Sequence, residues 1–413
     1  MELEKQTNKQ TKLHTMKNKI AIASAFIAAS SLATAEIVIN DFLSFEGFID
    51  MSYQHGDIDS DDVSVASGSD NSFQVDQVEI DWLFDFDPVT AQIDLAYYGS
   101  DAAGNAAFDN EGDVIVEQAF ATYHFEGDFE GSAVTAGRFA SMLGFEAFEP
   151  TGLYQFSFAY DYSILPGYSE GVKYTYESDN TFFGASILSS YADDQGYTGR
   201  LGGSGDSNWA AEIAGAYSMD NGVSLFLGGY YTDADADNDF TNDSNVDGET
   251  WVINAYATFE TGAWLFAAEV NYGDSESGAF GLDAEDGTLY GSTIGGAPYS
   301  INSDDATALS GLLMANYAYS EQGSVTARLS YEERSLDNAT AFSGSDPAFP
   351  DVDAGDVDAE QYKATLAHSW AFTDNLLLVT EISYIDGESD LDNGLEDEDF
   401  DGVLGAVELL FSF

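Results

Sequence analysis

Apolar and polar residues alternate along much of the chain from residue 42 onward. Because successive side chains of a β-strand point to opposite faces, this period of two predicts strands with one apolar and one polar face. Segment 324–334 is typical: Val325, Ala327, Leu329 and Tyr331 form one face, and Ser324, Thr326, Arg328, Ser330 and Glu332 form the other. Such a strand suits a wall with lipid on one side and water on the other.

Sixteen segments carry this pattern or a close variant of it. The predicted strands are 42–54, 73–86, 89–99, 113–125, 132–140, 170–177, 181–191, 208–218, 222–232, 249–259, 263–273, 307–319, 324–334, 361–372, 376–386 and 401–413. We therefore expect an all-β fold, a transmembrane antiparallel β-barrel of about sixteen strands.

The connections between these strands alternate between short and long. Short ones contain tight-turn sequences such as Asp220-Asn221-Gly222, which favour hairpins. The long ones are 55–72, 100–112, 141–169, 192–207, 233–248, 274–306, 335–360 and 387–400. Short periplasmic turns and long external loops are typical of outer-membrane barrels, whereas a soluble β-sandwich has no reason to sort its connections in this way.

The N-terminal segment predicts export. Met16-Lys17-Asn18-Lys19 is cationic, residues 20–32 are apolar, and Ala33-Thr34-Ala35 is a small-x-small cleavage sequence. We expect a signal peptide over 1–35, starting at Met16 and cleaved after Ala35, followed by a single barrel domain over 36–413. A transmembrane anchor is the weaker alternative, because the apolar run is short for a bilayer.

Composition supports an aromatic-rich barrel with a strongly acidic surface. The chain has 24 Tyr, 29 Phe, no Cys and a formal net charge of −63. Such a charge excludes nucleic acid as a partner, because nucleic-acid binding depends on Lys and Arg contacts to phosphate. Aromatic residues near the predicted strand ends are expected to form the interfacial girdles: Trp82, Phe84, Phe86, Tyr97, Tyr98, Tyr123, Phe125, Trp251, Trp264, Trp370 and Phe372.

Basic residues are rare after Glu36, and five of the six fall on the predicted lumen-facing positions: Arg138, Lys173, Arg328, Arg334 and Lys363. A cation on the lipid face costs about 2–4 kcal/mol near the bilayer midplane, so a lumenal position is expected. Two interpretations remain open. These cations either set a transverse field opposite acidic loop residues, or each pairs with a neighbouring carboxylate.

The long connection 141–169 contains six Phe and Tyr residues within 145–160, together with Glu146, Glu149 and Asp161. Because so many aromatic rings are unfavourable in water, we expect this connection to fold into the lumen and narrow it. Packing between subunits, or formation of an extra strand, are the alternatives.

Carboxylates crowd three other long connections, in runs from Asp233 to Asp247, from Asp351 to Glu360 and from Asp390 to Asp401. Hard cations bind several oxygens, so weak, distributed binding of divalent cations is expected. The spacing does not fit a calcium loop, because the twelfth position from Asp233 is Ser244, and no specific metal site or cofactor is predicted.

An enzyme is not expected. The four histidines are His14, His55, His124 and His368, and no nucleophile elbow, phosphate-binding loop or His-x-x-x-His sequence accompanies them. His368 and Ser369 are neighbours on a predicted strand and therefore point to opposite faces.

Two motifs resemble those of Gram-negative outer-membrane porins of the beta-barrel porin-2 type. The chain ends in Phe413, with Phe411, Leu409 and Val407 at alternate positions, which resembles the signal read by the barrel-assembly machinery. The sequences Val134–Phe139 and Leu143–Glu146, followed by Pro150, resemble a stretch of that family, as does the opening Glu36–Tyr53. The resemblance implies location in the outer membrane among its lipids, a water-filled channel and homotrimers.

These observations together predict a porin for passive diffusion of small hydrophilic solutes and ions, with a preference for cations. The alternatives are a substrate-selective channel for a sugar, peptide or carboxylate, and a structural or adhesive barrel whose pore is plugged.

Overall fold

The computed structural model describes residues 36–60, 68–99, 114–161, 163–189, 209–234, 248–276, 293–294, 297–298, 300–302, 305–342, 352–391 and 398–413. Within these ranges, no helix is long and apolar enough to cross a lipid bilayer. The predicted signal peptide, residues 1–35, lies outside the described residues, so it stays a prediction.

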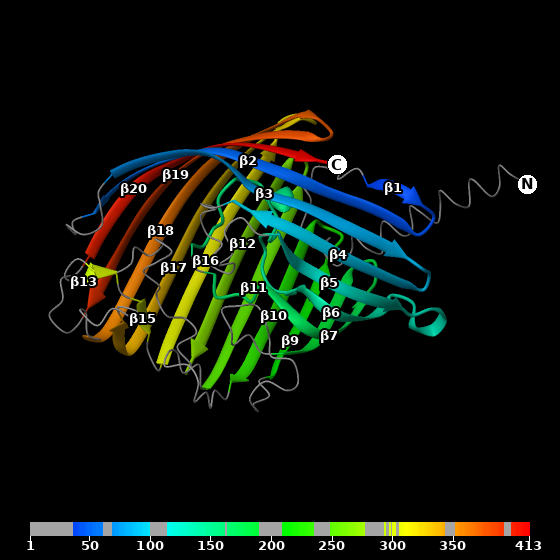
Figure 1. Cartoon of the computed structure of the whole chain (residues 1–413), viewed down its shortest axis with the longest axis horizontal. Helices are drawn as coiled ribbons and strands as arrows, with labels where there is room; N and C mark the ends of the chain where they lie inside the picture. The colour runs from blue at the N-terminus through cyan, green and yellow to red at the C-terminus, as the bar shows by residue number, and fades with distance from the viewer. Residues whose placement is uncertain are drawn as a thin grey trace, which may run out of the picture.

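All sixteen predicted strands are present, and they form one closed antiparallel barrel (Figure 1). They are β2 (Leu43–Ser60), β3 (Gly68–Asp85), β4 (Val89–Tyr98), β5 (Val114–His124), β6 (Ser132–Ala140), β7 (Tyr168–Glu177), β8 (Thr181–Ser189), β9 (Trp209–Ser218), β10 (Val223–Ala234), β11 (Gly248–Thr261), β12 (Trp264–Ser275), β16 (Asp305–Ala318), β17 (Gly323–Phe342), β18 (Val352–Thr373), β19 (Leu376–Leu391) and β20 (Glu398–Ser412).

Shorter elements accompany the barrel in the described residues. They are the strands β1 (Ile37–Asn40), β13 (Thr293–Ile294), β14 (Ala297–Pro298) and β15 (Ser300–Asn302), and the 3₁₀ turns η1 (Gly127–Phe129) and η2 (Pro150–Gly152). The strand β1, which the alternation did not predict, pairs with the first residues of β2.

The barrel closes where the last strand pairs with the first. Strand β20 runs antiparallel to β2, from the pair Phe48–Ser412 to the pair Ser60–Phe400. In Figure 1 the red β20 lies beside the blue β2. The main chain of Phe413 exchanges two hydrogen bonds of 2.9 Å with Gly47, so the pairing continues to the last residue. Closure removes the unpaired edges that an open sheet would expose to lipid.

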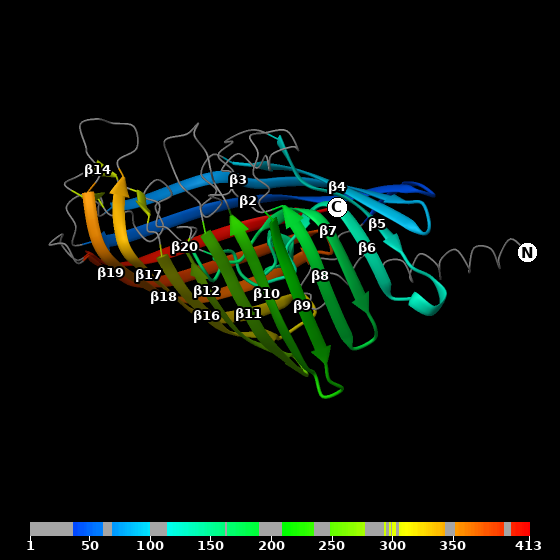
Figure 2. The ribbon, with the colours of Figure 1, turned by 90° about the horizontal axis from the view of Figure 1, so that it is seen from below.

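Short turns join the hairpins along one rim, and Figure 2 shows those of β5–β6, β7–β8 and β9–β10 on the same side. In the β9–β10 turn, Gly222 has a φ of 85°, a conformation that favours glycine. The side chain of Asn221 accepts a hydrogen bond of 3.2 Å from the backbone N–H of Val223. The predicted tight turn at this position is therefore confirmed.

The outward face of the barrel is apolar, and aromatic rings gather near both ends of the strands. Leu313, Leu329 and Ile187 point outward and are 61%, 59% and 71% exposed. Near the short turns, the rings of Trp264 and Tyr317 lie 4.5 Å apart. Tyr272, near the other end of the same strand, contacts Trp251.

The two aromatic levels are eight residues apart on β12, from Trp264 to Tyr272. At about 3.3 Å per residue this is about 26 Å along a tilted strand, on the scale of a membrane-embedded band. One residue that we expected in the girdle lies elsewhere. Tyr98 is buried inside the barrel, and its hydroxyl donates to Glu117. Its place at the end of a strand was a poor guide, because the face of the strand decides its environment.

The strands β17 and β18 are longer than predicted. Their pairing continues through Arg334–Ala359 and Leu336–Val357, so much of the predicted connection 335–360 is strand. Alternation of apolar residues marks only the part of a strand that faces lipid, whereas backbone pairing continues into water. The pattern therefore underestimates strand length at the acidic end of the barrel.

Placing a cation on the lipid face tests the assignment of the two barrel faces. On β7, Val172 points outward and is 52% exposed, whereas Thr175 lies on the lumenal face. We expect Val172→Arg to lower the free energy of unfolding by about 2–4 kcal/mol if it lies near the midplane. Thr175→Arg, the control on the same strand, should lower it by much less. Urea titrations of protein folded into lipid vesicles measure both changes, and equal losses would contradict the assignment.

Candidate functional site

The described residues of the segment between β6 and β7, 141–161 and 163–167, run inside the barrel, where the coil crosses the enclosed space in Figure 1. The first part of the segment is held by inward-facing side chains of three strands. The N–H of Met142 donates to Glu212 of β9 at 3.3 Å, and the N–H of Gly144 donates to Asn254 of β11 at 3.0 Å. The N–H of Phe145 donates to Glu269 of β12 at 2.7 Å.

The second part of this inward segment reaches the wall formed by β17, β18 and β19. The carboxylate of Glu381 accepts hydrogen bonds of 2.8 and 3.1 Å from the N–H groups of Phe156 and Ser157. The carboxylate of Glu332 accepts one of 3.0 Å from the N–H of Asp161. Wall carboxylates thus take the place of the strand partners that an irregular backbone lacks.

Apolar packing fixes the inward segment on the same side of the lumen. Leu143, Phe145 and Tyr160 are buried in a cluster with inward-facing side chains of β8 to β16. Wall members of this cluster are Phe182, Ala214, Ala216, Phe226, Tyr256, Leu265, Ala267, Leu312 and Met314. The segment therefore lies in the lumen, as its aromatic content led us to expect, and it forms the turn η2 rather than an extra strand.

Arg328 on β17 is the main basic anchor of the inward segment. Its guanidinium forms an ion pair of 2.6 Å with Glu146. It also donates to the carbonyl oxygens of Ser157 at 2.7 Å and of Phe158 at 2.8 Å. The carboxylate of Glu146 accepts a further hydrogen bond of 2.7 Å from the N–H of Ala159. One planar cation therefore holds two distant parts of the segment together.

The other predicted cations on this wall are also inward. Lys363 on β18 pairs with Asp161 and donates to the carbonyl oxygen of Phe158 at 3.3 Å. Arg334 is buried on the inward face of β17. For Arg328 and Lys363, the interpretation of direct pairing with acidic residues of the segment fits better than that of charges facing each other across an open gap.

The two remaining predicted cations behave differently. The ammonium of Lys173 lies 4.3 Å from the centre of the lumenal Phe139 ring, so Lys173 also faces inward. Arg138 pairs in register with Ala119 and Glu170, on the face opposite to that of Phe139. The guanidinium of Arg138 nevertheless lies 6.0 Å from the centre of the Tyr168 ring, and that ring contacts Phe148 of the inward segment. The lumenal position of this side chain therefore stays a prediction. The Nε of Arg138 donates to the backbone carbonyl oxygen of Glu117 at 2.9 Å.

Seven buried carboxylates line the opposite side of the lumen, and we call them the acidic wall. They are Asp50 of β2, Asp76, Glu79 and Asp81 of β3, Asp94 of β4, Glu117 of β5 and Glu408 of β20. With Glu212, Glu269 and Glu332, ten carboxylate side chains are buried in the described part of the chain, against three basic ones, Arg328, Arg334 and Lys363. The interior therefore carries an excess of acidic groups.

Glu149 of the inward segment meets the acidic wall rather than a cation. Its burial, followed by the nearby carboxylates of Glu117 and Asp94, raises the pKa of Glu149 to about 8. The three predicted acidic residues of the segment thus form two groups. Glu146 and Asp161 pair with basic residues, whereas Glu149 lies among other acids.

Sequence reasoning missed the wall residues that hold the segment, namely Glu212, Asn254, Glu269 and Glu381. Glu212 is a single charged residue on an inward face that is otherwise alanine, as in Ala210-Ala211-Glu212-Ile213-Ala214, whereas Glu269 shares its face with Asn271 and Glu381 shares its face with Ser383. Such inward-facing polar residues can be found in the sequence, but which of them bind the inward segment depends on the path of that segment through the barrel.

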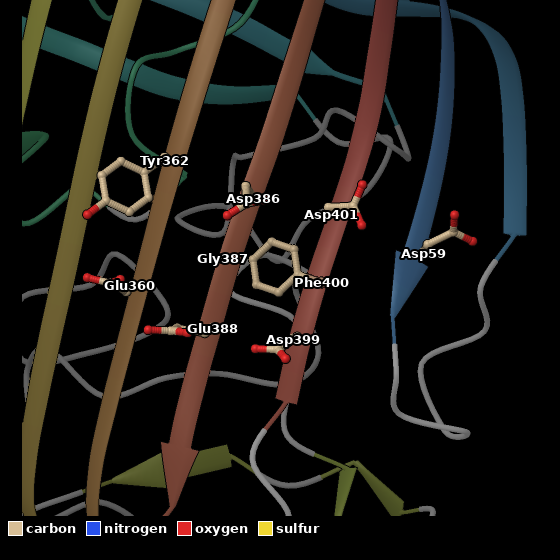
Figure 3. A pocket seen from close by; sticks show the side chains of 9 residues that line it. All are labelled: Asp59, Glu360, Tyr362, Asp386, Gly387, Glu388, Asp399, Phe400 and Asp401. Carbon is tan, nitrogen blue, oxygen red and sulfur yellow. The ribbon is translucent and has the colours of Figure 1, made fainter.

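A second acidic group lies on the outward face near the end of β18, β19, β20 and β2 (Figure 3). It lines a pocket of about 230 Å³, whose acidic members are Asp59, Glu360, Asp386, Glu388, Asp399 and Asp401. Four of these six fall in connections that we expected to be long acidic loops, and their strands place them side by side. Of the other predicted acidic run, residues 235–247 lie outside the described residues.

A closed sixteen-stranded barrel with an apolar outer band, whose lumen is entered by the segment between β6 and β7, defines an outer-membrane channel of the porin class. The family described as "Putative beta-barrel porin-2, OmpL-like" matches residues 43–413, and the chain belongs to it. The protein is therefore an outer-membrane protein, as its terminal sequence and its strand pattern indicated.

Solved structures of other outer-membrane proteins share the fold. The outer membrane channel DcaP of Acinetobacter baumannii aligns with a TM-score of 0.52 and 14% identity, over 90% of this chain and 97% of its own. OmpF of Salmonella typhi, solved with daunomycin, aligns with a TM-score of 0.52 and 16% identity, over 92% and 100%. OprB of Pseudomonas putida aligns with a TM-score of 0.52 and 12% identity, over 90% and 94%. No curated protein sequence matches the chain significantly.

Removing the guanidinium of Arg328 should loosen the inward segment. Arg328→Ala leaves the carboxylate of Glu146 without its cation, which costs about 3–5 kcal/mol for a buried pair. We expect larger and noisier single-channel currents in planar bilayers, because the segment leaves its position part of the time. Arg328→Met combined with Glu146→Gln removes both charges and should behave closer to wild type. Wild-type currents from Arg328→Ala would contradict the anchoring role.

Proposed function

We propose that the protein is a diffusion channel that lets small hydrophilic solutes and ions cross the outer membrane and that prefers cations. One observation carries the preference: ten buried carboxylates against three buried bases in the described part of the barrel. The ion pairs Arg328–Glu146 and Lys363–Asp161 use two of those bases on residues of the inward segment. The carboxyl groups of the acidic wall are left as the main acidic groups that face the lumen.

The physical basis of this preference is the field inside a narrow lumen. Fixed carboxylates between low-dielectric walls concentrate cations and exclude anions. A sixteen-stranded barrel is wide enough for an aqueous channel. The inward segment occupies the side lined by β8 to β19 and therefore limits the size of solutes that can pass.

Assembly belongs to the same proposal. The terminal residues Phe413, Phe411 and Leu409 lie on the outward face of β20, and Phe413 contacts the ring of Phe45 on β2 at 6.2 Å. An outward aromatic end on the last strand is accessible to an assembly machinery before the barrel closes. Homotrimer formation in the membrane is the expected state, and weak divalent cation binding outside the barrel is expected at the pocket in Figure 3.

The reversal potential in a KCl gradient tests the cation preference. Asp50→Asn combined with Glu408→Gln removes two carboxyl groups from the acidic wall. We expect the cation-selective potential of the wild-type channel to shift clearly toward zero in this variant. Asp399→Asn combined with Asp401→Asn removes two charges from the outward pocket and is the matched control, which should keep the wild-type potential.

Each alternative has its own result in these recordings. Small steps that one sugar, peptide or carboxylate blocks would replace the diffusion channel by a substrate-selective one. Silence from protein whose folding is verified by its resistance to unfolding in cold detergent would replace it by a structural barrel. Equal shifts in the two double variants would overturn the role of the acidic wall.

A further inference from the structure

We infer that Glu79, Asp81 and Asp94 form a specific divalent-cation site on the inner wall of the barrel, and that the ion it holds is Ca²⁺. The site differs from the outward acidic pocket and from the long acidic connections, where only weak binding was expected. It is also independent of whether ions permeate, because it concerns a resident ion of the wall.

The strand register brings the three carboxylates together. Glu79 and Asp81 lie two residues apart on the inward face of β3, and Asp81 pairs directly with Asp94 of β4. One carboxylate oxygen from each of the three lies within 4.8 Å of the others. Since Ca²⁺ lies 2.3–2.6 Å from its oxygen ligands, two ligands on opposite sides of the ion are about 4.6–5.2 Å apart. The three oxygens can therefore reach one ion together.

Buried oxygens without donors point to a missing ligand. Glu79 and Asp94 are both 0% exposed, and in each one carboxylate oxygen has no hydrogen-bond partner among the described residues. The same holds for one oxygen of Asp81, which is 7% exposed. Burying an ionised carboxylate without a counter-charge is costly, so these groups need either protons or a cation.

The other oxygens of the site are already oriented by amides. Gln77 donates to Oε2 of Glu79 at 2.8 Å. Gln92 and Gln118 donate to Oδ2 of Asp94 at 3.0 and 2.7 Å. Each amide holds one oxygen and leaves its partner oxygen free. Outer hydrogen bonds that fix carboxylates in this way are typical of metal sites and orient their ligands.

Two further carboxylates can complete the coordination. A bulge in β5 lies next to Asp94 in the register, and the buried Glu117 belongs to it, with one oxygen free of donors. Bulges often redirect a side chain at functional sites. Glu149 comes from the inward segment and lies near Glu117 and Asp94. An ion bound here would join that segment to the wall on the side away from Arg328 and Lys363.

Ca²⁺ fits this donor set better than Mg²⁺. Ca²⁺ accepts six to eight oxygens in flexible geometry, including several carboxylates, whereas Mg²⁺ requires near-octahedral geometry and keeps most of its waters. A crowded set of carboxylates from two strands, a bulge and a loop supplies many oxygens with little regularity. Protons shared among the carboxylates are the competing explanation, and they predict no tight binding of Ca²⁺.

Calorimetric titration of the whole purified barrel with CaCl₂, after chelator treatment at neutral pH, tests the site. We expect wild type to show one tight binding event above a weak background. Asp81→Asn combined with Asp94→Asn should lose the tight event, and Gln118→Leu should weaken it roughly tenfold or more. The outward variant with Asp399→Asn and Asp401→Asn should keep it. Only weak binding in wild type, or tight binding that survives in the wall variant, would overturn the proposal.

Limited proteolysis provides a second test, because it reports on how firmly the inward segment is held. We expect Ca²⁺ to slow proteolysis within residues 141–167 of wild type but not of the wall variant, while Glu149→Gln should lose most of this protection. The variant with Asp81→Asn and Asp94→Asn should fold, because it removes carboxylates that repel one another. Glu79→Gln provides a second variant of the same site. Recordings of reversal potential on the same samples keep the two proposals separate, since cation selectivity can persist when tight Ca²⁺ binding is absent.

Discussion

The whole structure depends on one constraint, that every backbone N–H and C=O group in lipid needs a partner within the protein. The chain meets it by pairing β20 with β2, down to the hydrogen bonds between Phe413 and Gly47. Closure fixes which face of each strand meets lipid and which meets the lumen. The apolar outer band and the inward position of polar residues both follow from that choice, since a charge on the lipid face is unfavourable.

The same requirement shapes the inward segment, whose irregular backbone has no strand neighbours. Its N–H groups donate to the wall carboxylates Glu212, Glu269, Glu332 and Glu381 instead. Arg328 complements them by donating to carbonyl oxygens of the segment. Acidic and basic side chains of the wall thus provide the hydrogen-bond partners that neighbouring strands provide elsewhere in the barrel. This explains why acidic residues outnumber basic ones even where the segment is well anchored.

The two sides of the lumen differ in how their charges are balanced. On β17 and β18, direct ion pairs neutralise Arg328 and Lys363. On β2 to β5, carboxylates face one another, and several of their oxygens have no donor in the described part of the chain. This side offers the strongest attraction for cations, whether they pass through or remain bound. The asymmetry connects the proposed selectivity with the proposed Ca²⁺ site, although each depends on different residues.

The sequence by itself determined the number of strands, the face of most residues and the short turns, because alternation and turn residues are local consequences of strand geometry. It also identified the inward segment from its aromatic content and Arg328 and Lys363 from parity. Only the tertiary structure decided the partners of Glu146, Asp161 and Glu149 and the inward position of Tyr98. It also brought Asp81 beside Asp94 and Glu117. These relations depend on register, on a bulge and on the path of one segment across the barrel, and none of them is encoded by residues that are close in the chain.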